Sequence, residues 1–325
     1  MQLYPIKFTP IAKETIWGGN KLRTVLSKDF PSTQKIGESW EISGVKNDIS
    51  LVANGQLKGE SLNDLIQKFG SRLLGEKVFQ KFGQEFPLLI KFIDADDALS
   101  IQVHPDDELA KERHNSFGKT EMWYVLDAEK DANLIVGFNQ EVDQKLYQQK
   151  LSEGKLEEIL NAEKVQNGSC YFIPAGRVHA IGKGILLAEI QQTSDITYRM
   201  YDWNRVDKEG KSRELHTEQA VDAIDYALEK EYATSYSTEI NNTTNLATCD
   251  YFTTNRLAFD KEISRDYTDL DSFIIYICLD GEFEISAENL EKTSVKKGES
   301  ILIPAELKEL ILKPLGATEC LEVYL

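Results

Sequence analysis

Short apolar runs separated by Gly, Pro, Asn and Asp make up most of this sequence, and they limit its fold more than any other feature. The clearest runs span residues 87–93, 99–103, 121–126, 133–138, 169–173, 185–191, 195–202, 273–279, 282–286, 300–303, 309–313 and 320–325. Many short strands at this spacing are typical of β-sandwiches and barrels. We therefore expect a mainly β protein with a few short helices.

Three segments carry helical patterns instead. Ser61 precedes apolar residues with helical spacing in 62–69, and Ser61 together with Asp64 forms a helix start signal. Residues 140–160 predict two short helices divided near Gly154. Thr217 is expected to cap a helix that continues through Leu228.

An internal repeat predicts two related domains. Residues 165–175 and 295–305 share Val, Gly, Ile, Pro and Ala at a constant offset of 130. Each copy has the pattern of a turn glycine, a short buried strand and a closing proline. A polar stretch rich in Ser, Thr and Asn follows residue 235, so we expect domains at 1–235 and 236–325.

The charge balance narrows the range of partners. Among 325 residues, 37 are Lys or Arg and 54 are Asp or Glu, which gives a net charge of −17. Such an acidic surface repels phosphate backbones, so nucleic-acid binding is not expected. A small anionic substrate remains possible if basic side chains are concentrated in one pocket.

The sequence predicts neither a membrane protein nor an exported one. Its apolar runs fall short of the about 20 residues that a membrane span needs. The first 19 residues lack the apolar core of an export signal. The four cysteines form no CxxC pair and are expected to be reduced thiols, which favours a cytoplasmic location.

The first candidate metal ligands lie in the segment LSIQVHP, residues 99–105. If this segment is a strand, Ser100, Gln102 and His104 point to one face. A Gln and a His two residues apart on one face can both reach one metal ion. The alternative interpretation is a polar face exposed to solvent.

A second histidine belongs to a more specific pattern. Gly168, Pro174, Gly176 and His179 follow the spacing of the second half of the motif found in cupins, which are small jelly-roll barrels that hold a metal. Gly176 permits a tight turn, after which His179 can point back into the barrel. The alternative is a chance turn followed by a core histidine.

A carboxylate completes the predicted ligand set. Glu121 begins an apolar strand, where a charged group needs a partner, and a metal ion is a suitable one. The alternative is an ordinary glutamate at a strand edge. Imidazole and oxygen ligands suit zinc, although manganese, iron or cobalt also fit. The second half lacks the set, because His179 aligns with Glu309 and Glu121 with Ile274.

Together these segments resemble the type I mannose-6-phosphate isomerases, members of the cupin superfamily. The resemblance rests on IWGG (16–19), GESWEIS (37–43), LSIQVHP (99–105), KTEM (119–122), IPAGRVH (173–179) and SDITYR (194–199), in the order found in the family. The length resembles the short bacterial form. The implied fold is mainly β, with two cupin-type jelly-roll barrels of which only the first binds metal.

The resemblance also implies a set of site residues. It implies one Zn²⁺ per chain, held by Gln102, His104, Glu121 and His179, with Arg199 catalytic and Lys119 in the pocket. It further implies that the substrate cavity is lined by Trp17, Glu38, Lys91, Ser100 and Asp195. Two positions depart from the long-form relatives, since Gly118 replaces a His and Ile181 replaces a Tyr.

The implied activity is the interconversion of mannose 6-phosphate and fructose 6-phosphate through an enediol. Lys119, Glu38 and a zinc-bound water are the candidate bases. Arg199 stays protonated and is expected to hold oxyanion or phosphate charge, with Asp195 in a position to orient it. The expected partner is a small sugar phosphate, and the chain is expected to be a monomer or a weak homo-oligomer. The rival functions are a metal-dependent dioxygenase and a sugar-binding protein without turnover.

Overall fold

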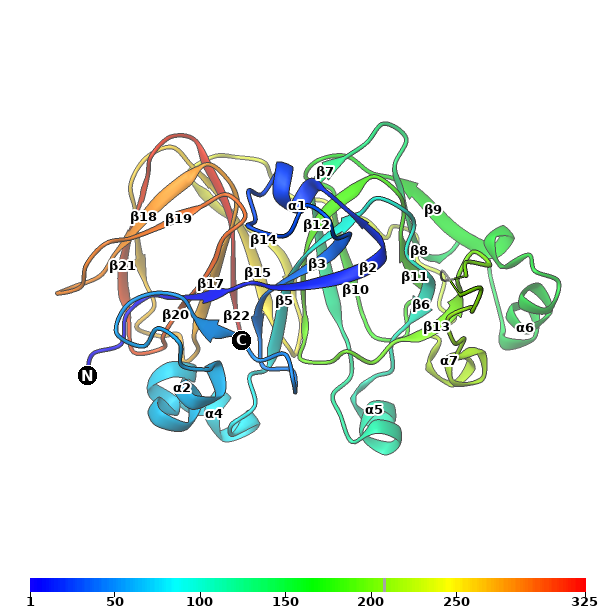
Figure 1. Cartoon of the computed structure of the whole chain (residues 1–325), viewed down its shortest axis with the longest axis horizontal. Coiled ribbons are helices and arrows are strands. Elements are labelled where there is room, and N and C mark those ends of the chain that lie inside the picture. Colours follow the sequence, from blue (N-terminus) through cyan, green and yellow to red (C-terminus); the bar gives the residue numbers. More distant parts are fainter. Residues whose placement is uncertain (207–208) are drawn as a thin grey trace.

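The computed structural model describes residues 1–206 and 209–325, and most of its ordered structure is β. Figure 1 shows two β-sandwiches side by side along the long axis, with the helices at the periphery. The first and the last residue both lie on the side of the C-terminal sandwich. The expectation of a mainly β fold is confirmed, although the sheets are open rather than closed into barrels.

Two facing sheets form the sandwich that contains the predicted site. The six-stranded sheet has the order β10 (Cys170–Ile173), β7 (Glu121–Ala128), β12 (Ile185–Gln192), β5 (Leu88–Ala95), β2 (Ile11–Gly19) and β3 (Ile36–Ser43). The five-stranded sheet has the order β13 (Tyr198–Tyr201), β6 (Ile101–Val103), β11 (His179–Ile181), β8 (Asn133–Phe138) and β9 (Leu160–Lys164). Trp123 and Leu187 of the first sheet pack in one cluster with Leu134 and Ile181 of the second.

The other sandwich is built mostly from C-terminal residues. Its seven-stranded sheet has the order β14 (Asn242–Thr248), β15 (Thr253–Phe259), β22 (Thr318–Tyr324), β17 (Ile274–Asp280), β20 (Ser300–Ile303), β1 (Ile6–Thr9) and β4 (Leu51–Val52). The four-stranded sheet has the order β16 (Ile263–Asp266), β21 (Glu309–Pro314), β18 (Glu282–Ser286) and β19 (Thr293–Lys296). Because β1 pairs with β20, this sandwich includes the N-terminal strand, and the division at 235–236 stays a prediction.

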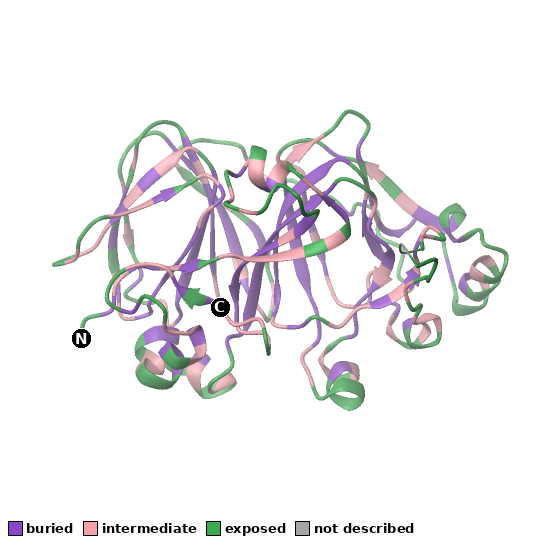
Figure 2. Cartoon of the chain, viewed as in Figure 1, coloured by how far each residue is buried: buried purple, intermediate pink, exposed green. Residues whose placement is uncertain are grey.

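The two large sheets also pack against each other. In β12, Leu186 and Ile190 face the cluster shared with the seven-stranded sheet, while Leu187 faces the interior of its own sandwich. In β17, Ile275 and Ile277 contact the same shared cluster. Strands buried on both faces read as continuous apolar runs, as these do in the sequence. Figure 2 shows the resulting buried layer across the middle of the molecule.

The topology supports the internal repeat. Strand order β10-β7-β12-β5 in one sheet matches β20-β17-β22-β15 in the other. The turn glycines Gly168 and Gly298 have φ angles of 85° and 82°, a region that favours glycine. Glu121 lies opposite Ile173, and Ile274 lies opposite Ile303, so Ile274 occupies the position of Glu121 in the second copy.

The helices are short and lie outside the sheets. They are α1 (Lys21–Thr24), α2 (Leu62–Phe69), α3 (Ser71–Leu74), α4 (Glu76–Phe82), α5 (Asp107–His114), α6 (Gln144–Ser152), α7 (Thr217–Ala223) and a 3₁₀ turn (Leu156–Ile159). The predicted start of α2 is confirmed, because Ser61 and Asp64 cap each other's backbone N–H groups. The pair of short helices around Gly154 is also confirmed. Within the described ranges, no helix is long and apolar enough to span a membrane.

The helix predicted after Thr217 differs in both its start and its end. Thr217 is the first helical residue rather than the cap, and the helix ends at Ala223 instead of continuing through Leu228. The backbone N–H of Asp225 donates to the carbonyl of Gly176 at 2.8 Å. This contact with the turn before β11 draws the chain into an extended conformation at Ile224.

Candidate active site

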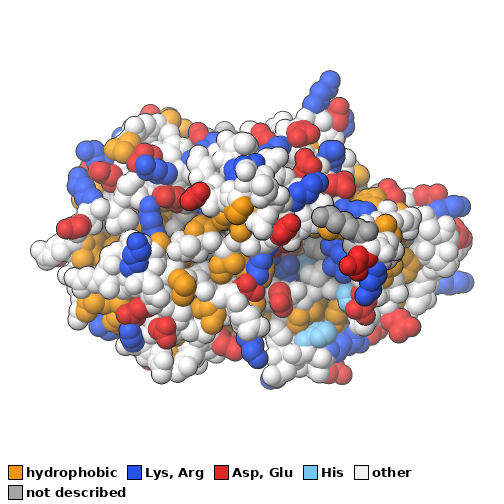
Figure 3. Space-filling model, viewed as in Figure 1, with side chains coloured by type: hydrophobic (Ala, Val, Ile, Leu, Met, Phe, Trp, Pro, Cys, Tyr) orange, Lys and Arg blue, Asp and Glu red, His pale blue; other side chains and the backbone are white. Residues whose placement is uncertain are grey.

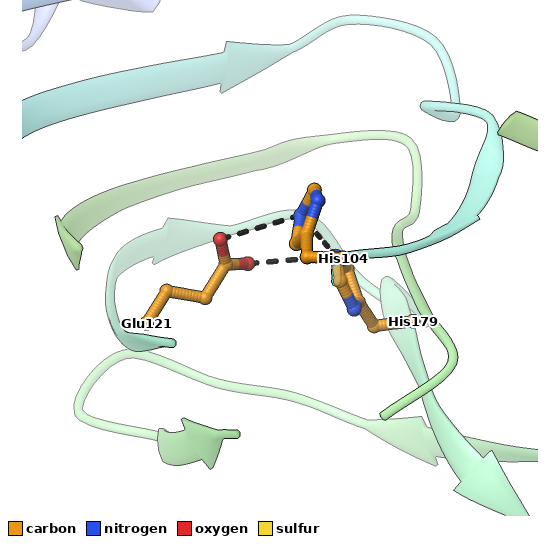
Figure 4. Close-up of side chains that lie close together, drawn as sticks. All are labelled: His104, Glu121 and His179. Atoms are coloured by element: carbon orange, nitrogen blue, oxygen red, sulfur yellow. Dashed lines mark hydrogen bonds and ion pairs between the residues drawn. The ribbon is translucent and has the colours of Figure 1, made fainter. Parts of the chain in front are cut away.

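Three ligand-type side chains converge inside the first sandwich from three different strands. His104 directly follows β6, His179 begins β11, and Glu121 begins β7 on the facing sheet. Gln102 of β6 lies opposite His179 in the β6–β11 pair, which brings the segments of the two histidines together. Figure 4 shows the imidazoles and the carboxylate pointing toward one another.

The distances between these groups are short. The Nε2 atoms of His104 and His179 lie 3.1 Å apart. One carboxylate oxygen of Glu121 lies 3.5 Å from His104 Nε2, and the other lies 3.5 Å from His179 Nε2. All three side chains are buried. Their ligand atoms all lie within 4.8 Å of one another, which makes this group a potential metal site.

The hydrogen bonds of the two imidazoles fix which nitrogens face the centre. His104 Nδ1 donates to the carbonyl of Ile196 at 2.9 Å, and His179 Nδ1 donates to the carbonyl of Arg177 at 2.8 Å. In a neutral imidazole the other nitrogen then carries a lone pair. Two lone pairs 3.1 Å apart repel each other, whereas a cation beside them is bound by both.

Glu121 fits the same interpretation. Neither of its carboxylate oxygens has a hydrogen-bond partner among the described residues, although both are buried. Burial and the nearby Glu189 raise the pKa of Glu121 to about 8. Burial also lowers the pKa of His179 to about 4. A buried carboxylate without hydrogen bonds is costly, and a metal ion is the partner that these donors suit.

Gln102 occupies a fourth position around this group. Its side-chain nitrogen lies 3.2 Å from His179 Nε2. The oxygen and nitrogen of a glutamine amide exchange places by a half-turn, so its oxygen can face the same point. The four residues that the sequence predicted as metal ligands therefore lie together.

A cavity of about 160 Å³ adjoins the group. It is lined by Trp17, Glu38, Trp40, Lys91, Ile93, Leu99, Ser100, Gln102, Lys119, Ile181, Glu189, Asp195, Thr197, Arg199 and Arg213. A larger hollow of about 1020 Å³ shares Asp195 with it, but its lining includes none of the four predicted ligands. We therefore place the chemistry in the smaller cavity. Figure 3 shows the face of the molecule hollowed in the right half of the view, with basic and histidine side chains nearby.

Two lysines and three glutamates form a charged network in and beside the cavity wall. Lys91 Nζ lies 3.0 Å from a carboxylate oxygen of Glu189 and 3.7 Å from one of Glu38. Although burial opposes it, these two carboxylates raise the pKa of Lys91, so it stays protonated. Lys119 Nζ lies 3.4 Å from Glu121 Oε2. Burial works against the ionised form of Glu189, but Lys91 and Lys119 outweigh it and lower its pKa to about 2.

The predicted arginine lies at the cavity, beside the group formed by Gln102, His104, Glu121 and His179. This group is called the metal group below. Arg199 of β13 lies directly opposite Gln102 of β6. Its Nη1 donates to the carbonyl of Glu214 at 2.8 Å, and its Nε is buried without a hydrogen-bond partner in the described part of the chain. Asp195 lines the same cavity, but the acceptor that orients Arg199 is the backbone of Glu214.

The cavity brings together the other predicted residues as well, because Trp17, Glu38, Lys91, Ser100 and Lys119 all contribute to its lining. Sequence reasoning missed several lining residues, chiefly Trp40, Glu189, Thr197 and Arg213. Glu189 interrupts a buried apolar strand, which is the signal that identified Glu121. Arg213 lies in a connection between elements, where no periodicity marks it.

The two positions that depart from long-form relatives have different surroundings. A side chain at Gly118 would have its Cβ 2.6 Å from the backbone of Asp106, so α5 leaves no room for one. Ile181, in contrast, lines the cavity and presents an apolar surface there. Of these two positions, only Ile181 contributes to the lining.

Comparisons with known proteins identify similar families and relatives. The family description "Phosphomannose isomerase type I, catalytic domain" matches residues 6–142. A second description, "Mannose-6-phosphate isomerase, cupin domain", matches residues 242–324. The two matches fall in the two halves of the internal repeat.

Individual relatives are similar over most or all of the chain. Mannose-6-phosphate isomerase ManA of Bacillus subtilis is 39% identical, with 100% of each chain covered. Mannose-6-phosphate isomerase of Streptococcus mutans is 35% identical over 90% of each chain. The crystal structure of the mannose 6-phosphate isomerase from Bacillus subtilis superposes with a TM-score of 0.89 at 33% identity, covering 99% of this chain and 100% of that one.

Proposed function

Because this chain belongs to the type I mannose-6-phosphate isomerase family and is an isomerase of that family, we propose that it interconverts D-mannose 6-phosphate and D-fructose 6-phosphate. We further propose that the reaction depends on zinc and passes through an enediol. The proposed zinc ligands are Gln102, His104, Glu121 and His179. The proposed substrate-binding residues are Trp17, Glu38, Lys91, Ser100 and Asp195.

One observation carries the metal part of the proposal. The Nε2 lone pairs of His104 and His179 face each other at 3.1 Å beside a carboxylate that lacks hydrogen bonds. The lone pairs repel each other and the buried carboxylate lacks hydrogen bonds, and a cation bound by all three groups offsets both costs. Nitrogen and oxygen donors in this number suit zinc. When bound, the ion supplies Lewis-acid polarisation of the sugar oxygens at C1 and C2.

The proton transfer is assigned to Lys119. The proton that leaves C2 of open-chain mannose 6-phosphate returns to C1 to give fructose 6-phosphate, so one group can carry it both ways. Lys119 is buried, lines the cavity and lies next to Glu121. Lys91 is unsuited to this role because Glu189 and Glu38 keep it protonated.

Glu38 is the alternative base. It lines the same cavity, where its carboxylate accepts a hydrogen bond from Trp40 Nε1 at 2.6 Å. Lys119→Met and Glu38→Gln distinguish the two. The substitution that removes the base abolishes exchange of the C2 hydrogen with solvent, whereas the other leaves exchange in place and weakens substrate binding.

Arg199 is proposed to stabilise the negative charge that develops on the enediolate oxygens. It remains protonated at any working pH, and its position opposite Gln102 places it beside the metal group. Its buried Nε has no hydrogen-bond partner in the described part of the chain, and the side chain lines the cavity. A donor that meets charge only in the transition state raises kcat.

The remaining proposals concern the whole protein. We propose that residues 1–235 act as the catalytic domain and 236–325 as a metal-free jelly-roll domain. We also propose that the protein works in the cytoplasm as a monomer or a weak homo-oligomer. The reduced state of the four cysteines supports the location, since all four are free.

A coupled assay tests the function. Purified protein is mixed with mannose 6-phosphate, and formation of fructose 6-phosphate is followed with and without oxygen. We expect steady turnover in both conditions. Binding without turnover would support a sugar-binding protein instead, and turnover that requires oxygen would support a dioxygenase.

A further inference from the structure

Three arginines gather around one buried carboxylate at the edge of the cavity, in a protein whose net charge is −17. They are Arg199, Arg205 and Arg213, and the carboxylate is that of Asp202. Two of them, Arg199 and Arg213, line the cavity. A concentration of positive charge against the overall field indicates a site for an anion.

Asp202 holds Arg213 in place. Arg213 Nε donates to one carboxylate oxygen of Asp202 at 2.7 Å, and Nη2 donates to the other at 2.5 Å. This paired contact fixes the plane of the guanidinium. It leaves Nη1, for which the described residues provide no hydrogen-bond acceptor. Because the side chain is 31% exposed, a ligand can reach it from the cavity.

In the described part of the chain, only two carboxylates form ion pairs with these three arginines. Asp202 accepts hydrogen bonds from Arg205 as well as Arg213, and Arg205 also lies 3.6 Å from a carboxylate oxygen of Asp97. Arg199 Nη1 donates to the neutral carbonyl of Glu214, while the charges of Asp202 and Glu214 act on Arg199 without direct contact. Arg199 and Arg213 repel each other, and an anion between them would relieve that repulsion.

Arg199 and Arg213 occupy different positions relative to the metal group. Arg199 belongs to β13 and lies opposite Gln102, a neighbour of His179. Arg213 lies beyond the end of β13, in the connection that leads to α7. When C1 and C2 of a sugar phosphate lie at the metal group, its phosphate end points away from Gln102.

We propose that Arg213, held by Asp202, is the residue of this chain that binds the phosphate of the sugar phosphate. Asp202 is its positioning residue. The assignment rests on the proposed function and deepens it, because it leaves Arg199 for the charge that develops at C1 and C2. The phosphate stays unchanged during the reaction, so this contact is equally strong in the ground and transition states.

Steady-state kinetics of Arg213→Gln provide the test. We expect KM for mannose 6-phosphate to rise about 10- to 100-fold, the effect of losing one hydrogen bond to a charged group, while kcat stays within about twofold. The inhibition constant of inorganic phosphate, used as a competitive inhibitor, should rise in parallel. Arg213→Lys should recover part of both losses, since it keeps the charge but not the planar fork.

Arg113→Gln is the matched control. Arg113 also pairs with one aspartate, Asp222, and its side chain is 30% exposed, but it does not line the cavity. The substitution Arg113→Gln removes the same charge as Arg213→Gln. It should leave KM and the inhibition constant of phosphate unchanged. Asp202→Asn should raise KM less than Arg213→Gln does, with kcat again retained.

The outcomes separate this assignment from the proposed function. Unchanged KM and phosphate inhibition in Arg213→Gln would overturn the assignment even if the wild type is an active isomerase. A fall in kcat alone would also overturn it. If the wild type lacks isomerase activity, calorimetry with inorganic phosphate still tests the anion site. Loss of phosphate binding in Arg213→Gln, but not in Arg113→Gln, supports the assignment.

Discussion

At the scale of single residues, the two histidine side chains His104 and His179 form the centre of the potential metal site. Each donates its Nδ1 proton to a backbone carbonyl, so each turns an Nε2 lone pair toward the other. The backbone therefore prepares the pair for a cation before any ligand arrives. In metal sites, a hydrogen bond from the ring nitrogen that does not bind the metal orients the histidine in this way.

Replacement of His179 by alanine tests the metal group. His179→Ala should lower metal content well below one ion per chain and abolish most isomerase activity, while the far-ultraviolet circular dichroism spectrum is retained. The fold should survive because the sandwich is held by large apolar clusters that do not include His179. Elemental analysis and the coupled assay are the measurements.

Glu309→Ala is the matched control, since Glu309 follows His179 at the repeat offset of 130 and begins β21. It should leave metal content and turnover unchanged. A His179→Ala protein that keeps both its metal and its turnover would remove His179 from the site. A large fall in the turnover of Glu309→Ala with an intact fold would give the second sandwich a catalytic role.

Arg199→Lys tests the role of the arginine beside the metal group. A point charge replaces a planar fork, so the enediolate loses a donor, and we expect kcat to fall by a factor that corresponds to about 2–4 kcal/mol. KM and metal content should change little. Steady-state kinetics check this prediction. A rise in KM at normal kcat would instead place Arg199 at the phosphate.

Single residues of the site could be predicted from the sequence where a strand pattern carried them. Gln102 and His104 alternate with apolar residues, which predicts one shared face, and Glu121 begins an apolar run, which predicts that its carboxylate is buried. Arg213 could not be found this way. Its place depends on a paired contact with Asp202, 11 residues earlier, which no local periodicity records.

At the scale of elements, β5 connects the core to the edge of the cavity. Its residue Asp94 is buried at the end of the strand and accepts a hydrogen bond from the backbone N–H of Lys21, the first residue of α1, at 2.6 Å. Burial raises the pKa of Asp94 to about 6, even though hydrogen bonds from the backbone of α1 oppose the rise.

The raised pKa predicts how stability depends on pH. The folded pKa of about 6 exceeds the ordinary aspartate pKa of 3.8, so the folded state binds the proton more tightly. The stabilisation from this proton is complete below about pH 4 and is lost as the pH rises to about 6. Asp94→Asn should therefore gain stability relative to the wild type across this window.

Urea unfolding at pH 4 and pH 6.5 measures the difference between wild type and Asp94→Asn. Asp29→Asn, at an exposed position, serves as the control for the chemical change itself. A constant difference between wild type and Asp94→Asn at both pH values would mean that folding does not raise the pKa of Asp94. Comparison at each pH cancels the titration of all other groups.

The elements themselves differ in how well the sequence predicts them. Central strands such as β12 and β17 are buried on both faces and stand out as unbroken apolar runs. Helix α2 was predicted because Ser61 and Asp64 form a capping box. Helix α5 was missed because it buries only Ala110 and consists mostly of charged residues. The end of α7 depends on a tertiary contact with Gly176.

At the scale of the whole molecule, one strand arrangement occurs twice, and among the described residues only one copy carries a group of ligand-type side chains. The equivalent strands β7 and β17 present Glu121 and Ile274 at the same register position. Among residues 1–206 and 209–325, the group of His104, Glu121 and His179 is the only potential metal site of its kind. We therefore expect about one divalent ion per chain, and elemental analysis showing two would contradict this.

The repeat could be predicted from the sequence because turn glycines and closing prolines fix the same local geometry in both copies. The placement of β1 could not. Residues 6–9 join the sheet of the C-terminal strands by pairing with β20, almost 300 positions away in the sequence. Pairing over such a distance is decided by the packing of the two sandwiches, which local patterns do not describe.

Isomerase activity measured before and after removal of the metal tests the central claim most directly. The protein is treated with a chelator and dialysed, its metal content is checked by elemental analysis, and conversion of mannose 6-phosphate is followed before and after zinc is returned. We predict that turnover disappears with the metal and returns with about one zinc ion per chain, while the circular dichroism spectrum stays constant. Full turnover by metal-free, folded protein would contradict the claim that the site of His104, Glu121 and His179 works through a bound metal.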